Sequence, residues 1–138
     1  MADHINALVV HEMDETFHEL ARTLEALGIR VIYASSFKQA AHLLKEHRAI
    51  DLVFAGTDLQ DGGWADVLML TQNERAGTPL ILVSRTVDVR LYLDALGMGV
   101  FDYVSPPFLT SDFAHIVRVA VYRDLVSVEQ DWTARSAA

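Results

Sequence analysis

The stretch DLVFAGTDLQDGG, residues 51–63, determines the fold and contains the position where function is expected. Its first five residues are apolar after the opening aspartate, which is typical of a strand buried on both faces of a parallel sheet. Two glycines then break the chain before a helix that starts at Trp64. In open parallel sheets, ligands and chemistry lie just beyond the carboxyl ends of the strands. Gly56 stands at that end of this strand, and it has no side chain that could react.

The composition excludes several classes of protein. A chain of 138 residues with 51% hydrophobic residues is long and apolar enough for one folded domain. The absence of cysteine excludes disulfide and thiolate chemistry. The net charge of −8 disfavours contact with nucleic acid or with an anionic membrane. The start of the chain does not resemble a signal peptide, and no apolar run approaches the roughly 20 residues that span a bilayer. We therefore expect a cytoplasmic protein, or a soluble part of a larger one.

Five apolar segments alternate with five amphipathic ones along the chain. The predicted strands are residues 5–10, 29–34, 51–55, 80–84 and 101–104. Asp14 is expected to cap the first helix, and Ser36 with Gln39 to form a capping box on the second. Thr110 or Ser111 is expected to cap the fifth. The predicted inner face of the fourth helix consists of Val89, Tyr92, Leu93 and Leu96. This alternation predicts an α/β fold with a doubly wound parallel sheet.

The end of the chain differs in character from the rest. Residues 1–125 are expected to form the domain, and residues 126–138, which are small and polar, a helix extension followed by a tail or linker. The apolar stripe of the fifth helix continues through Leu125 and Val128, which would suit a short coiled-coil lead.

Four blocks of sequence, in this order, resemble the receiver domains of two-component response regulators over about residues 5–125. They are Val9-Val10 with the two residues after it, the strand 51–55 with its glycine turn, the strand 81–84, and the run 97–108. The resemblance implies a flavodoxin-like (βα)5 fold with strand order 2-1-3-4-5. It also implies an aspartate that accepts a phosphoryl group, an acidic pair for a divalent cation, and a lysine before a cis-proline.

The residues at these reactive positions depart from the family pattern. The phospho-acceptor position falls on Gly56 and the lysine position on Pro106, so both the nucleophile and the ammonium group are missing. The acidic pair falls on His11 and Glu12, so only one of the carboxylates that would hold Mg²⁺ remains. Because an unpaired buried lysine would be costly, the joint loss indicates a site that was abandoned as a whole.

Other positions of the family pattern are retained. Ser84 stands at the Ser/Thr position, Tyr103 at the aromatic switch position, and Pro107 at the position of the cis-proline. The predicted remnant pocket comprises His11, Glu12, Gly56, Asp58, Ser84, Tyr103 and Pro106. We interpret Asp58 and Asp61 as solvated loop carboxylates rather than substitute acceptors. Trp64 is expected to pack over the pocket as a lid, with the anchoring of a partner as the alternative.

These observations lead to two hypotheses of different class. The first is a degenerate receiver that acts as a phosphorylation-independent interaction or dimerisation module in signal transduction or transcriptional regulation. Its contacts are expected on the face of the fourth helix, fifth strand and fifth helix, with a protein partner or a second copy. The alternative is a sensor that binds a small molecule or nucleotide in the emptied pocket. We expect no enzymatic activity, no cofactor and no metal, because no set of nucleophile, base and orienting group is evident.

Overall fold

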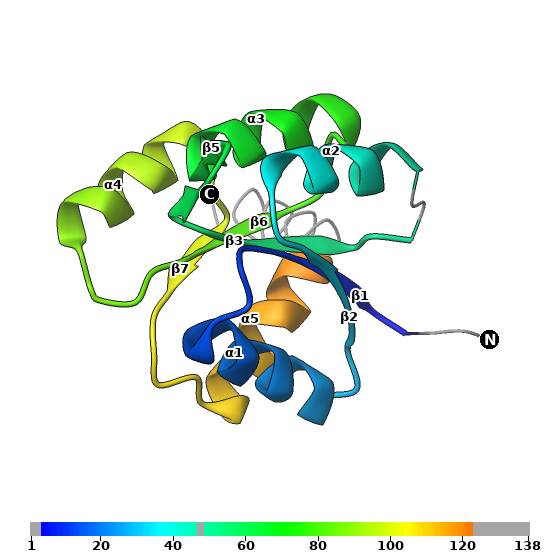
Figure 1. The fold of residues 1–138 in the computed structure, drawn as a ribbon. Helices are drawn as coiled ribbons and strands as arrows, with labels where there is room; N and C mark the ends of the chain where they lie inside the picture. Colours follow the sequence, from blue (N-terminus) through cyan, green and yellow to red (C-terminus); the bar gives the residue numbers. More distant parts are fainter. Residues whose placement is uncertain (1–3, 47–48, 123–138) are drawn as a thin grey trace, which may run out of the picture.

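The computed structural model describes residues 4–46 and 49–122, and these fold around a five-stranded parallel sheet (Figure 1). The spatial order of the strands is β2-β1-β3-β6-β7. Their bounds are Asn6–Val10 for β1, Arg30–Ala34 for β2, Leu52–Gly56 for β3, Leu80–Val83 for β6 and Asp102–Val104 for β7. The two remaining strands, β4 (Asp58–Leu59) and β5 (Gly62–Gly63), form a small hairpin after β3. Apart from this hairpin, the order is the predicted 2-1-3-4-5, so the fold prediction is confirmed.

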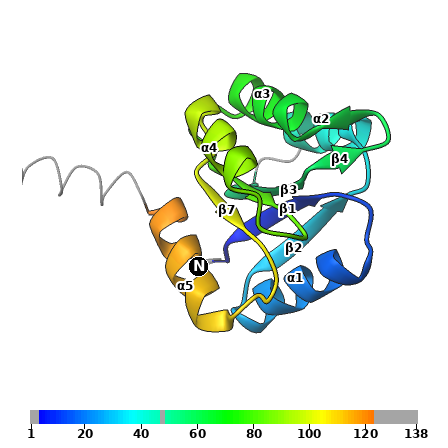
Figure 2. The same cartoon turned by 90° about the vertical axis from the view of Figure 1, so that its left-hand side faces the viewer.

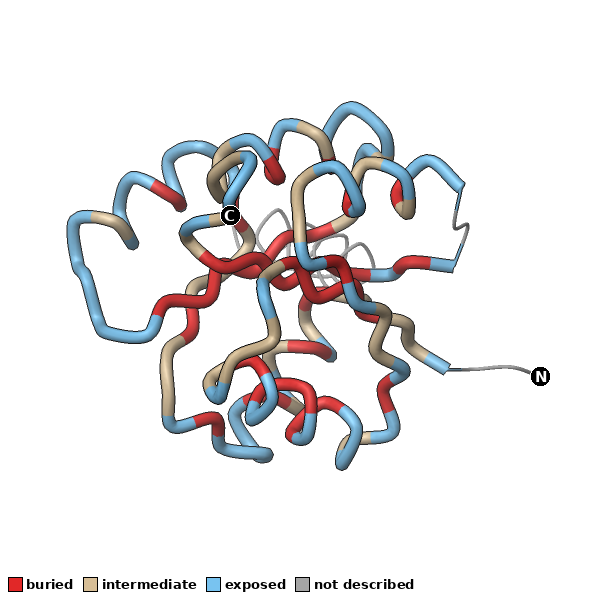
Figure 3. The backbone as a smooth tube through the Cα atoms, in the orientation of Figure 1, coloured by how far each residue is buried: buried red, intermediate tan, exposed pale blue. Residues whose placement is uncertain are grey.

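Helices cover both faces of the sheet (Figures 1 and 2). On one face lie α1 (Glu15–Ala26) and α5 (Thr110–Val121), and on the other α2 (Phe37–Glu46), α3 (Trp64–Glu74) and α4 (Val89–Met98). Each face has its own hydrophobic core, because alternate residues of each strand point to opposite sides. All five residues of β3 are buried, which agrees with its central place and its apolar sequence (Figure 3).

The first turns of the helices confirm some of the expected caps and contradict another. The Asp14 carboxylate accepts a hydrogen bond from the Phe17 N–H at 3.0 Å, so the cap of α1 is confirmed. The expected cap of α5 is wrong. That helix begins at Thr110, and Leu109 occupies the N-cap position without a side-chain hydrogen bond. A leucine can hold this position because its extended backbone, and not its side chain, leads the chain into the helix.

The start of α2 receives a cap that the sequence did not suggest. Ser36 accepts a bond from the Gln39 N–H at 3.1 Å as expected, whereas the Gln39 side chain bonds to Ser35 and not to Ser36. In addition, the Asp61 carboxylate accepts bonds from the backbone N–H groups of Phe37 at 2.8 Å and Lys38 at 3.1 Å. The glycine-rich loop therefore caps a helix that precedes it by more than twenty residues in the chain.

These two bonds lower the pKa of Asp61 from its usual value, first through Phe37 N–H and then through Lys38 N–H. Between the two pKa values, the unfolded chain binds more protons at Asp61 than the folded chain does. The contribution of Asp61 to stability is therefore present above its unfolded pKa and is lost as the pH falls through the folded pKa.

We expect Asp61→Ala to lower the free energy of unfolding at neutral pH, and the difference from the parent to vanish in acid. Urea titrations across the acid range measure this. The matched control is Asp58→Ala in the same loop, since Asp58 caps no helix; an equal pH-dependent loss there would contradict the assignment.

The predicted inner face of α4 is wrong. Val89 and Leu93 are 64% and 61% exposed, and Tyr92 and Leu96 are also exposed. Ala95 is the buried residue of this helix, and Leu91 packs beside it against the sheet. The two candidate faces share the same helical spacing, so periodicity does not distinguish them. The face with Ala95 packs against the sheet, so the larger side chains on the opposite face remain in solvent.

Two further features complete the fold. Gly99 ends α4 in the left-handed conformation, with φ 111°, which glycine adopts without strain. Within residues 4–46 and 49–122, no helix is both long enough and apolar enough to cross a membrane. Residues 123–138 lie outside the described part of the chain, so the boundary at residue 125, the extension 126–138 and the proposed coiled-coil lead stay predictions.

Candidate functional site

The carboxyl end of β3 carries no reactive group, and the space above it is filled. Gly56 is buried and pairs with Val83 of β6 at the edge where the strands end. A Cβ atom on Gly56 would lie 2.2 Å from His11 Cδ2 and 2.9 Å from Phe17 Cζ. The ring of His11 therefore lies where the side chain of an acceptor residue would begin.

His11 is held over Gly56 by two contacts. Its ring stacks on Phe17 with 4.2 Å between the ring centroids and 10° between the planes. Its Nδ1 donates a hydrogen bond to the Glu12 carbonyl oxygen at 2.8 Å. We expected the lost carboxylate and ammonium to leave room beside Gly56, and this expectation is wrong, because an aromatic pair occupies the place.

Two hollows remain at this edge of the sheet. One of about 210 Å³ lies beside the imidazole, below the roughly 300–1,000 Å³ of most ligand pockets. It is lined by His11, Phe17, Thr57, Asp58, Val83, Ser84, Arg85 and Thr86. A wider one of about 500 Å³ shares Thr57, Asp58 and Ser84 with it and extends to Trp64. Trp64 thus forms a wall of the wider hollow, and both the lid role and the ligand-binding alternative stay predictions.

Ser84 and Tyr103 are bonded to the loop that joins β6 to α4. The buried Ser84 hydroxyl donates to the Thr86 carbonyl oxygen at 2.7 Å. The Tyr103 hydroxyl donates to the same carbonyl at 3.0 Å and accepts from the Asp88 N–H at 3.0 Å. The Asp88 carboxylate in turn caps α4 through the Leu91 N–H. Tyr103 therefore fixes the start of α4 and is not one of the residues that line the two hollows.

The remaining predicted residues lie outside the hollows. Glu12 is exposed and contributes its backbone carbonyl to the His11 contact. Pro106 precedes Pro107, and the peptide bond between them is cis, as the sequence suggested. Of the seven predicted residues, the structure brings together His11, Gly56, Asp58 and Ser84, and leaves Glu12, Tyr103 and Pro106 around them.

Two residues of the site are not among those that the sequence indicated. Phe17 of α1 belongs to the hydrophobic core, and its ring also supports His11. Arg85 directly follows Ser84, and its guanidinium forms an ion pair with the Asp14 carboxylate beside the smaller hollow. The position of Arg85 directly after a strand end was the available signal, since side chains there gather at the edge of a parallel sheet.

Comparison with known proteins identifies the family. The model of the response regulator receiver domain matches residues 7–118, from the second residue of β1 into α5. The chain belongs to the response regulator receiver domain family. Receiver domains are signalling modules of two-component systems that interact with partner proteins, and this chain shares that general role.

Individual relatives agree with this assignment. The chain is 30% identical over 122 residues to the transcriptional regulatory protein KdpE of Mycobacterium tuberculosis, covering 88% of this chain and 53% of that protein. It therefore spans about half the length of the curated relatives it matches.

Solved receiver domains share the fold. One from an HD domain-containing protein of Pseudomonas fluorescens has a TM-score of 0.74 at 23% identity, over 87% of this chain and 96% of that one. One from Clostridium thermocellum has a TM-score of 0.76 at 20% identity, over 88% and 98%. One from a sensor histidine kinase of Pseudomonas aeruginosa, with magnesium in its active-site cleft, has a TM-score of 0.74 at 18% identity, over 86% and 98%.

Proposed function

We propose that this receiver domain is degenerate, does not accept a phosphoryl group, and acts as a phosphorylation-independent interaction or dimerisation module in signal transduction or transcriptional regulation. The observation that carries the proposal is the His11 ring, which occupies the space over Gly56 where an acceptor side chain would stand. Aspartyl phosphorylation requires a carboxylate nucleophile and cationic stabilisation of the transferred group. Gly56 has no nucleophile, and Pro106 has no ammonium group.

Nearby side chains are poor substitutes for the missing groups. Asp58 lines both hollows, but it lies in the exposed hairpin, with its Oδ2 3.3 Å from the Thr57 hydroxyl. Arg85 is paired with Asp14 and 58% exposed, so its charge is shared and solvated. Among the described residues, no group of three or more histidine or carboxylate side chains is arranged to hold a metal ion. This supports loss of the whole phosphorylation chemistry.

The α4 helix offers the surface for a partner. Large apolar side chains in solvent are concentrated on it and on the loop before it, namely Val87, Val89, Tyr92, Leu93, Leu96 and Met98. Exposed apolar patches of this kind mark sites of protein interaction. Tyr92 packs edge-on against Tyr103 of β7, with 5.5 Å between the ring centroids, so the surface extends from α4 to β7. We assign contact with a protein partner or a second copy to this α4–β7–α5 face.

The bonds of Tyr103 explain how the face could be presented without phosphorylation. Tyr103 and Ser84 both hold Thr86, and Asp88 caps α4, so protein groups alone fix the start of the helix. No phosphoryl group is needed to set the orientation of its exposed side chains.

The proposal predicts that the chain stays unmodified under phosphorylating conditions. We expect incubation with acetyl phosphate and Mg²⁺ to leave the intact mass unchanged, and beryllofluoride with Mg²⁺ to leave the backbone amide resonances at Gly56, Asp58 and Ser84 unchanged. A receiver with an intact acceptor aspartate serves as the positive control for both reagents. A stable adduct would contradict the proposal, and its loss in Asp58→Asn would show that Asp58 had become the acceptor.

A further inference from the structure

The outer edge of β2 is open for a further strand. In the described part of the chain, β2 pairs with β1 alone and lies at one end of the sheet, opposite β7. The Arg30 N–H donates to the Ile5 carbonyl, and the Ala34 carbonyl accepts from the His11 N–H. In a parallel pair, alternate residues of a strand bond to the same neighbour. The N–H and C=O groups of Val31 and Tyr33 therefore point away from β1, off the edge of the sheet.

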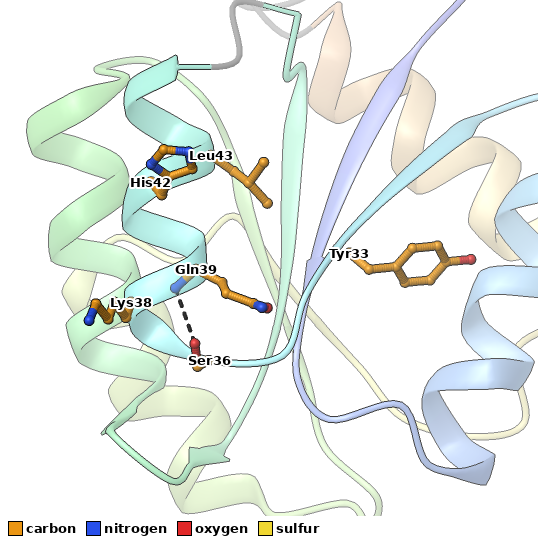
Figure 4. Close-up of a pocket in the computed structure, with 6 residues that line it drawn as sticks. All are labelled: Tyr33, Ser36, Lys38, Gln39, His42 and Leu43. Carbon is orange, nitrogen blue, oxygen red and sulfur yellow. Dashed lines mark hydrogen bonds between the residues drawn. The ribbon is translucent and has the colours of Figure 1, made fainter.

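A groove accompanies this edge. It has a volume of about 510 Å³ and is lined by Tyr33, Ser36, Lys38, Gln39, His42 and Leu43. Figure 4 shows the α2 residues on one side of β2, while the Tyr33 side chain points to the other side, away from α2. A chain laid along the edge would thus place alternate side chains against α2 and beside Tyr33. The open edge ends at Ser35, whose N–H donates to the Gln39 side chain at 2.7 Å.

The α2 side of the groove is basic. Lys38 and His42 line the groove, and Lys45 lies beyond its lining on the same face of the helix, at intervals of four and three residues; all three side chains are exposed. They include both lysines of a chain whose net charge is −8. The opposite side of β2, where Val31 and Tyr33 lie, is not basic. There the pKa of Tyr33 is raised by burial and by the nearby Glu25 carboxylate.

The geometry points to a second docking site at β2, independent of the α4–β7–α5 face, that takes an extended acidic segment of a partner protein. The segment would add to the sheet as a sixth strand through the polar groups of Val31 and Tyr33. Its acidic side chains would face Lys38, His42 and Lys45, and its alternate apolar side chains would lie beside Tyr33. Main-chain bonds would provide the docking, and the charges of α2 would select acidic over basic segments.

A second copy of the chain does not suit this edge. If two β2 strands paired antiparallel about a two-fold axis perpendicular to the sheet, both α2 helices would lie on the same face. The two basic stripes would then approach each other, and like charges would oppose the pairing. The segment of opposite charge is therefore the occupant that the surface fits.

The test uses the chain described here and a short blocked peptide in which valine and glutamate alternate. We expect the peptide to slow hydrogen exchange of the Val31 and Tyr33 amides at saturation at least about tenfold, because those N–H groups become bonded. Ile32, whose N–H already faces β1, serves as the internal reference. Two further peptides carry N-methyl groups, one on all valines and the other on all glutamates. Because only one of these two sets of amides faces β2, we expect one methylated peptide to lose binding and the other to keep it.

Charge variants separate the proposal from nonspecific attraction. The double variant Lys38→Glu and Lys45→Glu is expected to raise the dissociation constant of the peptide about tenfold or more. Arg90→Glu on α4, a charge reversal of the same kind, is expected to leave the dissociation constant unchanged. A peptide in which valine and lysine alternate is expected not to bind. Unchanged exchange at Val31 and Tyr33, or equal binding of both N-methylated peptides, would overturn the proposal. Neither result would affect the proposed function, which concerns Gly56 and α4.

Discussion

Gly56→Ala is expected to lower the free energy of unfolding by about 1–3 kcal/mol, the usual cost of adding a methyl group to a filled site. The added Cβ would lie 2.2 Å from His11 Cδ2 and 2.8 Å from its Cγ. Gly56 is not among the glycines with positive φ, so the backbone itself would accept alanine. The loss therefore comes from the contacts with the His11 imidazole and the Phe17 ring, and chemical denaturation with urea measures it.

The matched control is Gly97→Ala, the same change in α4. A Cβ on Gly97 meets no atom within 4 Å, so alanine there should raise stability by up to about 1 kcal/mol through helix propensity. In a His11→Ala background, the cost of Gly56→Ala should fall, because only the contact with Phe17 then remains, and the cycle should show a coupling of about 1 kcal/mol or more. Additive effects of the two changes would contradict the packing described over Gly56. It also follows that restoring an aspartate at position 56 would require His11 to move.

Leu93→Glu is expected to weaken association of the chain at least about tenfold, equivalent to about 1.4 kcal/mol, while leaving the fold intact. Leu93 lies in the apolar surface of α4 and is 61% exposed. A glutamate there would remain solvated in the free chain and would be desolvated in any contact through this face. Sedimentation velocity over a concentration series measures self-association, and circular dichroism confirms that the domain is folded.

Met69→Glu is the matched control, because Met69 of α3 is also 61% exposed but lies outside the α4–β7–α5 face. It should leave association unchanged. A parent chain that stays monomeric at millimolar concentration would contradict dimerisation and leave a different protein as the partner. Equal losses in Leu93→Glu and Met69→Glu would show that the contact does not depend on α4.

The prediction from sequence succeeded where a signal is local or repeated. The apolar run of β3 and the glycines after it gave a buried central strand and a turn, because full burial requires apolar side chains at every position. Asp14 was recognised as a cap because its bond to Phe17 spans one helical turn. The resemblance placed Gly56 at the reactive position, and the family assignment agrees with the resemblance.

The prediction failed where the decision depended on distant residues. Asp61 caps α2 across more than twenty residues, and no local sequence pattern predicts such a bond. The inner face of α4 was misassigned because the buried side of a helix depends on what packs against it, here the sheet beneath Ala95. The expected cavity beside Gly56 was absent for the same reason, since His11 and Phe17 come from β1 and α1 regions that meet β3 only in the folded chain.

The sequence by itself determined the order of the elements, the parallel sheet, and the absence of a carboxylate at position 56 and of an ammonium group at position 106. These follow from the identity and periodicity of residues along the chain. The folded structure alone shows that the His11 imidazole lies over Gly56 against Phe17, and that the large side chains of α4 remain in solvent. Both depend on packing between segments far apart in sequence, which composition and periodicity do not specify.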